Sequence, residues 1–158
     1  MVRFKNRWLL VEFLPIPSGT SSTSAAGLHQ IEGKHVWSAL KESVLSHFGD
    51  VGWGAVGLSL NVKYYSPTTH ICIIRVAREH HKIAWGAATM LRSIEGIGCL
   101  PHVVHVSGTI KHVQLAAIEH NRVVVARYRA RANVPSATKD SYEDYLETSR
   151  NEIEGLRD

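Results

Sequence analysis

Residues 56–77, VGLSLNVKYYSPTTHICIIRVA, predict two antiparallel β-strands joined by a tight turn. Apolar residues occupy every second position of the first part, so we expect a strand over residues 53–65 with one apolar face. The segment Ser66-Pro-Thr-Thr69 is typical of a turn, and residues 70–77 are rich in the β-branched types that favour strands. The stretch therefore predicts a hairpin.

On the N-terminal side of this hairpin we predict one strand and one helix. Apolar and polar residues alternate over residues 3–14, which indicates the strand. Apolar residues recur every four positions over residues 33–48, which indicates the helix, and Gly49 is a typical C-terminal stop. Residues 15–33 are rich in Pro, Ser, Thr, Gly and Ala, so we expect a flexible insertion there.

On the C-terminal side the order is helix, strand, helix. The apolar stripe predicts a helix over residues 79–97 that ends at Gly98, followed by a short strand over residues 102–107. The hydroxyl of Thr109 can cap a third helix, which we expect to continue towards residue 131.

This element order predicts an α+β, ferredoxin-like (RRM-like) β-α-β-β-α-β sandwich, with a four-stranded antiparallel sheet and an added C-terminal helix. We place the ferredoxin-like RNA-binding domain at residues 1–132 and an acidic, partly disordered C-terminal tail at residues 133–158. Within the tail, Tyr142, Tyr145 and Leu146 can dock a short helix. RNA-recognition motifs share this topology with many enzymes and regulatory domains, so the fold alone does not give the function.

The charge of the chain is unevenly distributed. The net charge is +4, but residues 139–158 hold three basic and seven acidic residues, a net charge of −4. Residues 1–138 therefore hold 15 basic and seven acidic residues, a net charge of +8. A basic body of this kind is typical of proteins that bind a polyanion. No apolar run approaches the about 20 residues that a membrane-spanning helix needs, and we expect no signal peptide.

The sequence lacks the patterns that protein catalysts and metal sites use. The ten histidines show no zinc-type spacing, and no G-x-S-x-G elbow, nucleotide-binding glycine loop or pair of carboxylates is present. Cys72 and Cys99 stand alone, and we interpret them as reduced core residues of an intracellular protein. We expect no catalysis by the protein itself, no metal site and no protein-bound cofactor.

Phosphate contacts are the mode of RNA binding that the sequence supports. The predicted strand over residues 70–77 has no aromatic residue on which a base could stack, and its outer Ile71 and Ile73 suit a protein partner or a further helix. Backbone N–H groups at a helix start, with a lysine beside them, suit a phosphate, and Ser107-Gly-Thr-Ile-Lys111 offers both.

Basic residues at alternate positions of the first strand are the other strong candidates, although charges that protect an edge strand from aggregation would look the same. A solvated helix face is the competing interpretation for the basic residues of the last helix. The candidate cations are Arg3, Lys5, Arg7, Arg75, Arg78, Lys111, Arg122 and Arg127.

Three short motifs occur in a familiar order and spacing. They are MVRFKNRWLL at residues 1–10, IIRVARE at residues 73–79 and VSGTIK at residues 106–111. Together they resemble the eukaryotic type of the processing-of-precursor subunit five family of ribonuclease P and ribonuclease MRP. The resemblance extends over residues 1–131, apart from the insertion at residues 15–33.

The resemblance implies a non-catalytic protein subunit of a ribonucleoprotein. Its partners would be the ribonuclease P or MRP RNA and a barrel-like ribonuclease P protein subunit, with other subunits of the particle. The RNA, with Mg²⁺, would remove the 5′ leader of precursor tRNA, and the MRP particle would process precursors of ribosomal RNA. The location would be the nucleus and nucleolus. The RNA-binding residues to which the motifs and charges point are Arg3, Lys5, Arg7, Arg75, Arg78, Thr109, Lys111 and Arg122. For Arg75 and Arg78, structural pairing with Glu79 or with the tail is an alternative role.

Two other interpretations stay open from the residues alone. A different basic ferredoxin-like protein, such as a ribosomal one, would bind RNA without the barrel-like partner. A dimerising ferredoxin-like domain for a small molecule would have a defined pocket and a weak, salt-labile affinity for RNA.

Overall fold

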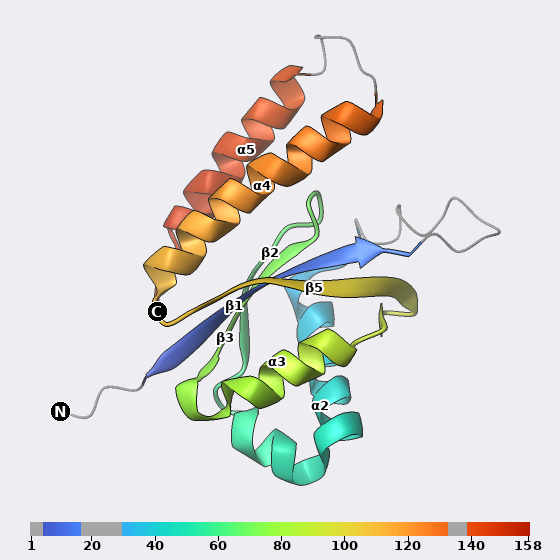
Figure 1. The fold of residues 1–158 in the computed structure, drawn as a ribbon, viewed down its shortest axis with the longest axis vertical. Coiled ribbons are helices and arrows are strands. Elements are labelled where there is room, and N and C mark those ends of the chain that lie inside the picture. Colours follow the sequence, from blue (N-terminus) through green and yellow to red (C-terminus); the bar gives the residue numbers. More distant parts are fainter. Residues whose placement is uncertain (1–4, 17–29, 133–138) are drawn as a thin grey trace.

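The computed structural model describes residues 5–16, 30–132 and 139–158, and its centre is a five-stranded antiparallel sheet (Figure 1). The strands lie in the order β2-β3-β1-β5-β4, which confirms the ferredoxin-like arrangement and adds one short strand to the four that were predicted. Their bounds are Asn6–Pro15 for β1, Asn61–Tyr65 for β2, Ile71–Ala77 for β3, Ser93–Ile94 for β4 and Ile97–Ser107 for β5.

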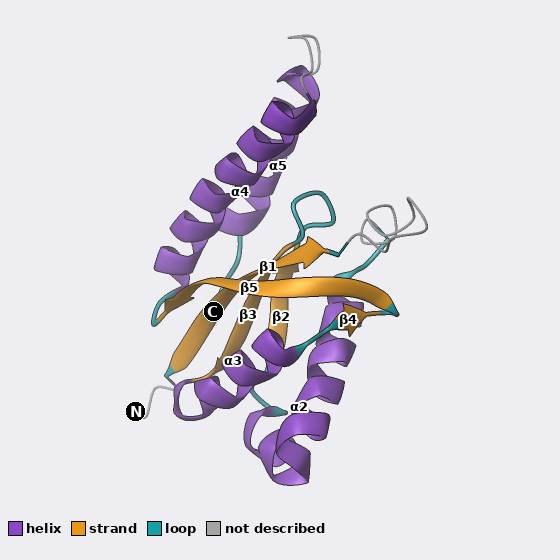
Figure 2. Cartoon of the chain, turned by 45° about the vertical axis from the view of Figure 1, so that its right-hand side comes forward, coloured by secondary structure: helices purple, strands orange, loops and turns teal. Residues whose placement is uncertain are grey.

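Helices cover both faces of this sheet (Figure 2). Helix α2 (Gly33–Val56) and helix α3 (His81–Met90), with a 3₁₀ turn at Arg78–His80, pack on one face. Helix α4 (Ile110–Ala132) and helix α5 (Lys139–Glu154) pack against each other, and α4 lies over the opposite face. None of the described helices is long and apolar enough to cross a membrane.

Strand β1 is buried on both faces because it lies in the middle of the sheet. Leu9, Val11 and Phe13 belong to the apolar core under α2 and α3, whereas Trp8 and Leu10 belong to the core under α4 and α5. A strand buried on both sides has a nearly continuous apolar sequence, and the run from Trp8 to Leu14 shows this except at Glu12.

The predicted hairpin is present, but its first strand is shorter than expected. Helix α2 kinks at Gly49, which has φ 65°, and then continues to Val56. The ring of Trp53 makes an edge contact with Trp37 at 5.8 Å between centroids, and this contact holds the second part of the helix against the first. The strand prediction for residues 53–60 was therefore wrong, and Leu58 in that segment is fully exposed.

The predicted helix over residues 79–97 was also too long, because α3 ends at Met90. Glu95 and Gly96 have φ values of 50° and 75°, the left-handed pair that a two-residue hairpin turn requires. This turn joins β4 to β5, so β5 begins at Ile97 and not at residue 102.

The last helix is longer than we predicted. Helix α4 begins as expected, and the Thr109 hydroxyl accepts a hydrogen bond from the His112 N–H at 3.4 Å. In place of the short helix expected around Tyr142, α5 covers Lys139–Glu154 and buries Ile153, while residues 133–138 of the predicted tail lie outside the described residues. Ile71 and Ile73 are fully buried in the cluster that contains Val113 of α4 and Ile153 of α5, so a further helix, and not a protein partner, covers them. Most of the predicted insertion, residues 17–29, lies outside the described residues.

Candidate nucleic-acid interface

The antiparallel topology gathers segments from the whole length of the chain at one end of the sheet. Trp8, near the start of β1, pairs with Arg75 near the end of β3 and with Ser107 at the end of β5. The Arg78 N–H donates to the Lys5 carbonyl at 2.9 Å. We call this region the basic end of the sheet; its described members are Lys5, Arg7, Arg75, Arg78, Thr109 and Lys111.

The basic residues of the first motif differ in position and exposure, whereas we predicted that all three project from one face of a strand. Arg3 lies outside the described residues, and Lys5 precedes the first residue of β1 and is exposed. Arg7 is half-buried, and its guanidinium donates to the Asn6 carbonyl at 3.3 Å. A Cβ at position 108 would lie 3.1 Å from Arg7 Nη1, so Gly108 leaves space for this guanidinium.

The start of α4 is held in place by hydroxyl groups. The Ser107 hydroxyl donates to the Thr109 carbonyl at 2.9 Å and accepts from the Thr109 N–H at 3.1 Å. Lys111 is exposed in the first turn, which contains no acidic residue. The positive end of the helix dipole and this ammonium group favour an anion at the same place.

Arg75 and Asn6 share a carboxylate. The Asn6 side-chain amide donates to Asp158 Oδ1 at 2.8 Å, and Arg75 Nη1 lies 3.8 Å from the same oxygen. Pairing with the tail, one of the two roles considered for Arg75, is therefore present in this structure.

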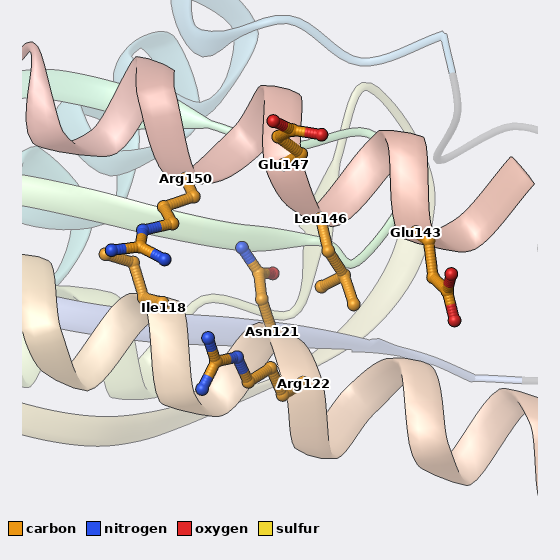
Figure 3. A pocket seen from close by; sticks show the side chains of 7 residues that line it. All are labelled: Ile118, Asn121, Arg122, Glu143, Leu146, Glu147 and Arg150. Atoms are coloured by element: carbon orange, nitrogen blue, oxygen red, sulfur yellow. The ribbon is translucent and has the colours of Figure 1, made fainter. Parts of the chain in front are cut away.

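Arg122 lies apart from the other candidates. It is on the exposed side of α4, eleven residues or about 16 Å along the helix from Lys111. There it lines a cavity of about 290 Å³ between α4 and α5 (Figure 3). Glu143, Glu147 and Arg150 line the same cavity from α5, so its two arginines are balanced by two glutamates.

The sequence patterns did not predict a buried ion cluster that lies on the side of the sheet covered by α4. Glu12 is only 3% exposed and accepts a hydrogen bond from His120 Nε2 at 2.8 Å. Arg127 lies 3.4 Å away and His102 3.8 Å away. Burial alone would raise the pKa of Glu12, but the hydrogen bond to His120 and the three basic groups together lower it. A glutamate inside an apolar strand was the signal that something must pair with it.

The cysteines fit the core role that was predicted for them. Cys72 and Cys99 are free and buried, and burial raises the pKa of the Cys99 thiol to about 11. Thiols of this kind are poor nucleophiles and poor metal ligands. Among the described residues, no group of three or more His, Cys, Asp or Glu side chains is placed to hold a metal ion.

Comparison with known proteins agrees with the motifs at the basic end. The model of the Rpp14/Pop5 family matches residues 7–118, which include the second and third motifs and the last four residues of the first. The chain belongs to this family. The resemblance inferred from the three motifs is thus confirmed, and the described basic end is built mainly from residues within the matched region of this Rpp14/Pop5 protein.

Individual relatives point the same way. The ribonuclease P/MRP protein subunit POP5 of Schizosaccharomyces pombe is 43% identical over 133 residues, covering 77% of this chain and 89% of that protein. The subunit of the same name in Danio rerio is 30% identical over 161 residues, covering 98% of this chain and 91% of that protein. A chain of the cryo-EM structure of yeast ribonuclease MRP shares the fold with a TM-score of 0.52 at 9% identity, covering 70% of this chain and 79% of that chain.

Proposed function

We propose that this Rpp14/Pop5 protein is a non-catalytic subunit of ribonuclease P and ribonuclease MRP, and that it holds the RNA of these particles at the basic end of the sheet. One observation supports this site most strongly. Three motifs that lie far apart in the sequence come together at one end of the sheet, at the start of β1, the end of β3 and the start of α4.

The role of these residues is to neutralise phosphates. A catalytic RNA must bring its own phosphates close together, and lysine and arginine side chains replace condensed counterions at such places. The RNA, with Mg²⁺, supplies the chemistry of cleavage, and the protein contributes no catalytic group. Bases do not stack on the sheet in this proposal, because α4 and α5 cover the face that RNA-recognition motifs use for stacking.

The names of the relatives as ribonuclease P/MRP subunits support assembly into such a particle with other subunits. The finer parts of the proposal rest on the resemblance of the three motifs. They are contact with the particle RNA and a barrel-like protein subunit, removal of the 5′ leader from precursor tRNA, processing of ribosomal RNA precursors, and a location in the nucleus and nucleolus.

Purification of the tagged protein from its own cells tests the proposal. We expect one or two defined, structured RNAs in the eluate, together with cleavage of precursor tRNA at the 5′ leader. The double variant Arg7→Ala/Lys111→Ala should lose most of this RNA and of the cleavage. Lys34→Ala/Arg92→Ala removes the same charge from exposed positions away from the basic end and should keep both.

The other outcomes decide between the alternatives. An eluate that contains only ribosomal RNA would identify a ribosomal-type protein. An eluate without RNA and without cleavage would contradict an RNA-binding function.

A further inference from the structure

Asp158 lies against the basic end of the sheet. Asn6, at the first position of β1, and Arg75, near the end of β3, both contact its carboxylate. Figure 1 shows the end of the chain, marked C, at the same end of the molecule as the first turn of α4. An acidic residue of the tail therefore occupies a place where we propose that RNA binds.

The carboxylate does not use all the donors that this place offers. It lies 3.8 Å from one terminal nitrogen of Arg75, which is too long for a strong hydrogen bond. The Nε atom of Arg75 is buried and has no hydrogen-bond partner among the described residues. A guanidinium matches a phosphate better than a single carboxylate oxygen, because it can donate two parallel hydrogen bonds to two phosphate oxygens.

Contacts with α4 hold the C-terminal segment of the chain in position beside the basic end. The Gln114 side-chain amide, which is buried, donates to the carbonyls of Ile153 at 2.7 Å and of Leu156 at 3.2 Å. The buried Ile153 anchors the same segment in the apolar cluster. Only the last residues beyond this anchor need to move to uncover Arg75.

We propose that Asn6 and Arg75 form a binding site for an RNA phosphate, and that Asp158 occupies this site until RNA displaces it. This proposal rests on the proposed function, because Asp158 can compete with RNA only if RNA binds at the basic end. Displacement is easy because the ion pair is long and partly exposed to solvent, with 27% of the Arg75 side chain and 43% of the Asp158 side chain accessible. Asp158 weakens the binding of arbitrary RNA. An RNA that makes all the other contacts of the basic end displaces it.

RNA affinity of single-charge variants tests the competition. With the full chain and a short fluorescent RNA hairpin at low salt, Asp158→Asn should tighten binding about three-fold. Glu152→Gln is the matched control, because it removes the same charge from an exposed position of α5 that does not contact Asn6 or Arg75. We expect it to tighten binding much less. In an Arg75→Ala background, Asp158→Asn should have no further effect.

A second measurement does not depend on RNA. The nuclear magnetic resonance signal of Arg75 Nε–H should shift on addition of inorganic phosphate, and at lower phosphate concentration in Asp158→Asn than in the parent protein. An unmoved signal would contradict a phosphate site.

The two proposals fail in different ways. If Asp158→Asn and Glu152→Gln tighten RNA binding equally, the tail acts only through net charge and the competition is wrong. If Asp158→Asn binds RNA like the parent protein, the competition is wrong while the proposed function stands. If no variant binds RNA, the proposed function and the assignment of this site to RNA fail together.

Discussion

The two faces of the sheet are closed in different ways. Under α2 and α3 the buried side chains are almost all apolar, from Leu9 and Phe13 on β1 to Leu40 on α2. Under α4 and α5 the apolar cluster is smaller and lies beside a network of buried polar groups. The described members of this network that form hydrogen bonds are the buried Glu12, Ser66, Thr69, Gln114, His120, Asn121 and Ser149 and the half-buried Tyr64 and Tyr145.

The two layers differ in the kind of contact that determines their structure. Apolar contacts have no preferred direction, so the α2 and α3 layer depends on shape and volume. The Thr69 hydroxyl donates to Asn121 at 2.7 Å, and the Asn121 amide donates to Ser149 at 2.9 Å. Because buried donors and acceptors must be paired, these bonds allow only one position of α4 and α5 on the sheet. The polar layer therefore fixes where the tail meets the basic end.

Removing volume from the apolar layer should have the largest effect on stability. Phe13 is fully buried, so Phe13→Ala should lower the free energy of unfolding by about 4 kcal/mol through lost transfer energy and the cavity left behind. Denaturant unfolding at neutral pH measures this loss. A loss no greater than that of the polar variants below would contradict the contrast between the layers.

Breaking the ion cluster should cost less and should depend on pH. Glu12→Gln removes the charge that His120 and Arg127 face, and we expect a loss of about 2 kcal/mol at pH 7. Because the pKa of Glu12 is lowered on folding, its ionised form stabilises the protein above the ordinary value of 4.5, and this stability is lost as the pH falls through the lowered value. The difference between the variant and the parent protein should therefore shrink in acid. Unfolding curves at a series of pH values check this, and a constant difference would contradict the assignment.

Removing one hydroxyl from the polar network should have a smaller effect. Tyr64 shares a hydrogen bond of 2.7 Å with Ser149, so Tyr64→Phe should lower stability by about 1 kcal/mol. Tyr142→Phe is the control, because the described contact of Tyr142 is between its ring and Arg129. Equal losses in the two variants, measured by denaturant unfolding, would show that the network does not hold α5.

The smallest effect on stability is expected at the basic end itself. Asp158→Asn removes an exposed ion pair and should change the free energy of unfolding by less than about 0.5 kcal/mol. Thermal unfolding of the variant and the parent protein should therefore coincide. A large loss would mean that Asp158 holds the fold together, and it would remove the basis for an easily displaced competitor.

The sequence predicted the parts of the fold that local patterns determine. The alternation in β1, the β-branched run of β3 and the cap at Thr109 each led to the correct element. The errors occurred where tertiary contacts or a turn decided between two patterns. The contact of Trp53 with Trp37 keeps residues 53–56 helical, and the Glu95-Gly96 turn ends an apolar stripe that otherwise looks helical.

The sequence identified candidate residues for the site but could not show how they are arranged. Lys5, Arg7, Arg75 and Lys111 were identified by charge and motif, but only the strand register shows that the segments that contain them meet at one end of the sheet. The contact between Asn6 and Asp158 joins residues 152 positions apart, and no local pattern predicts such a contact. The same limit applies to the pairing of Glu12 with His120.

Crosslinking of RNA to the protein within the purified particle tests most directly whether RNA meets the basic end of the sheet. Ultraviolet irradiation, digestion and mass spectrometry would locate the crosslinked peptides. We predict crosslinks in the segments that contain Lys5 and Arg7, Arg75 and Arg78, and Thr109 and Lys111. Crosslinks confined to the outer surface of α2 and α3, with none at the basic end, would contradict the proposed interface.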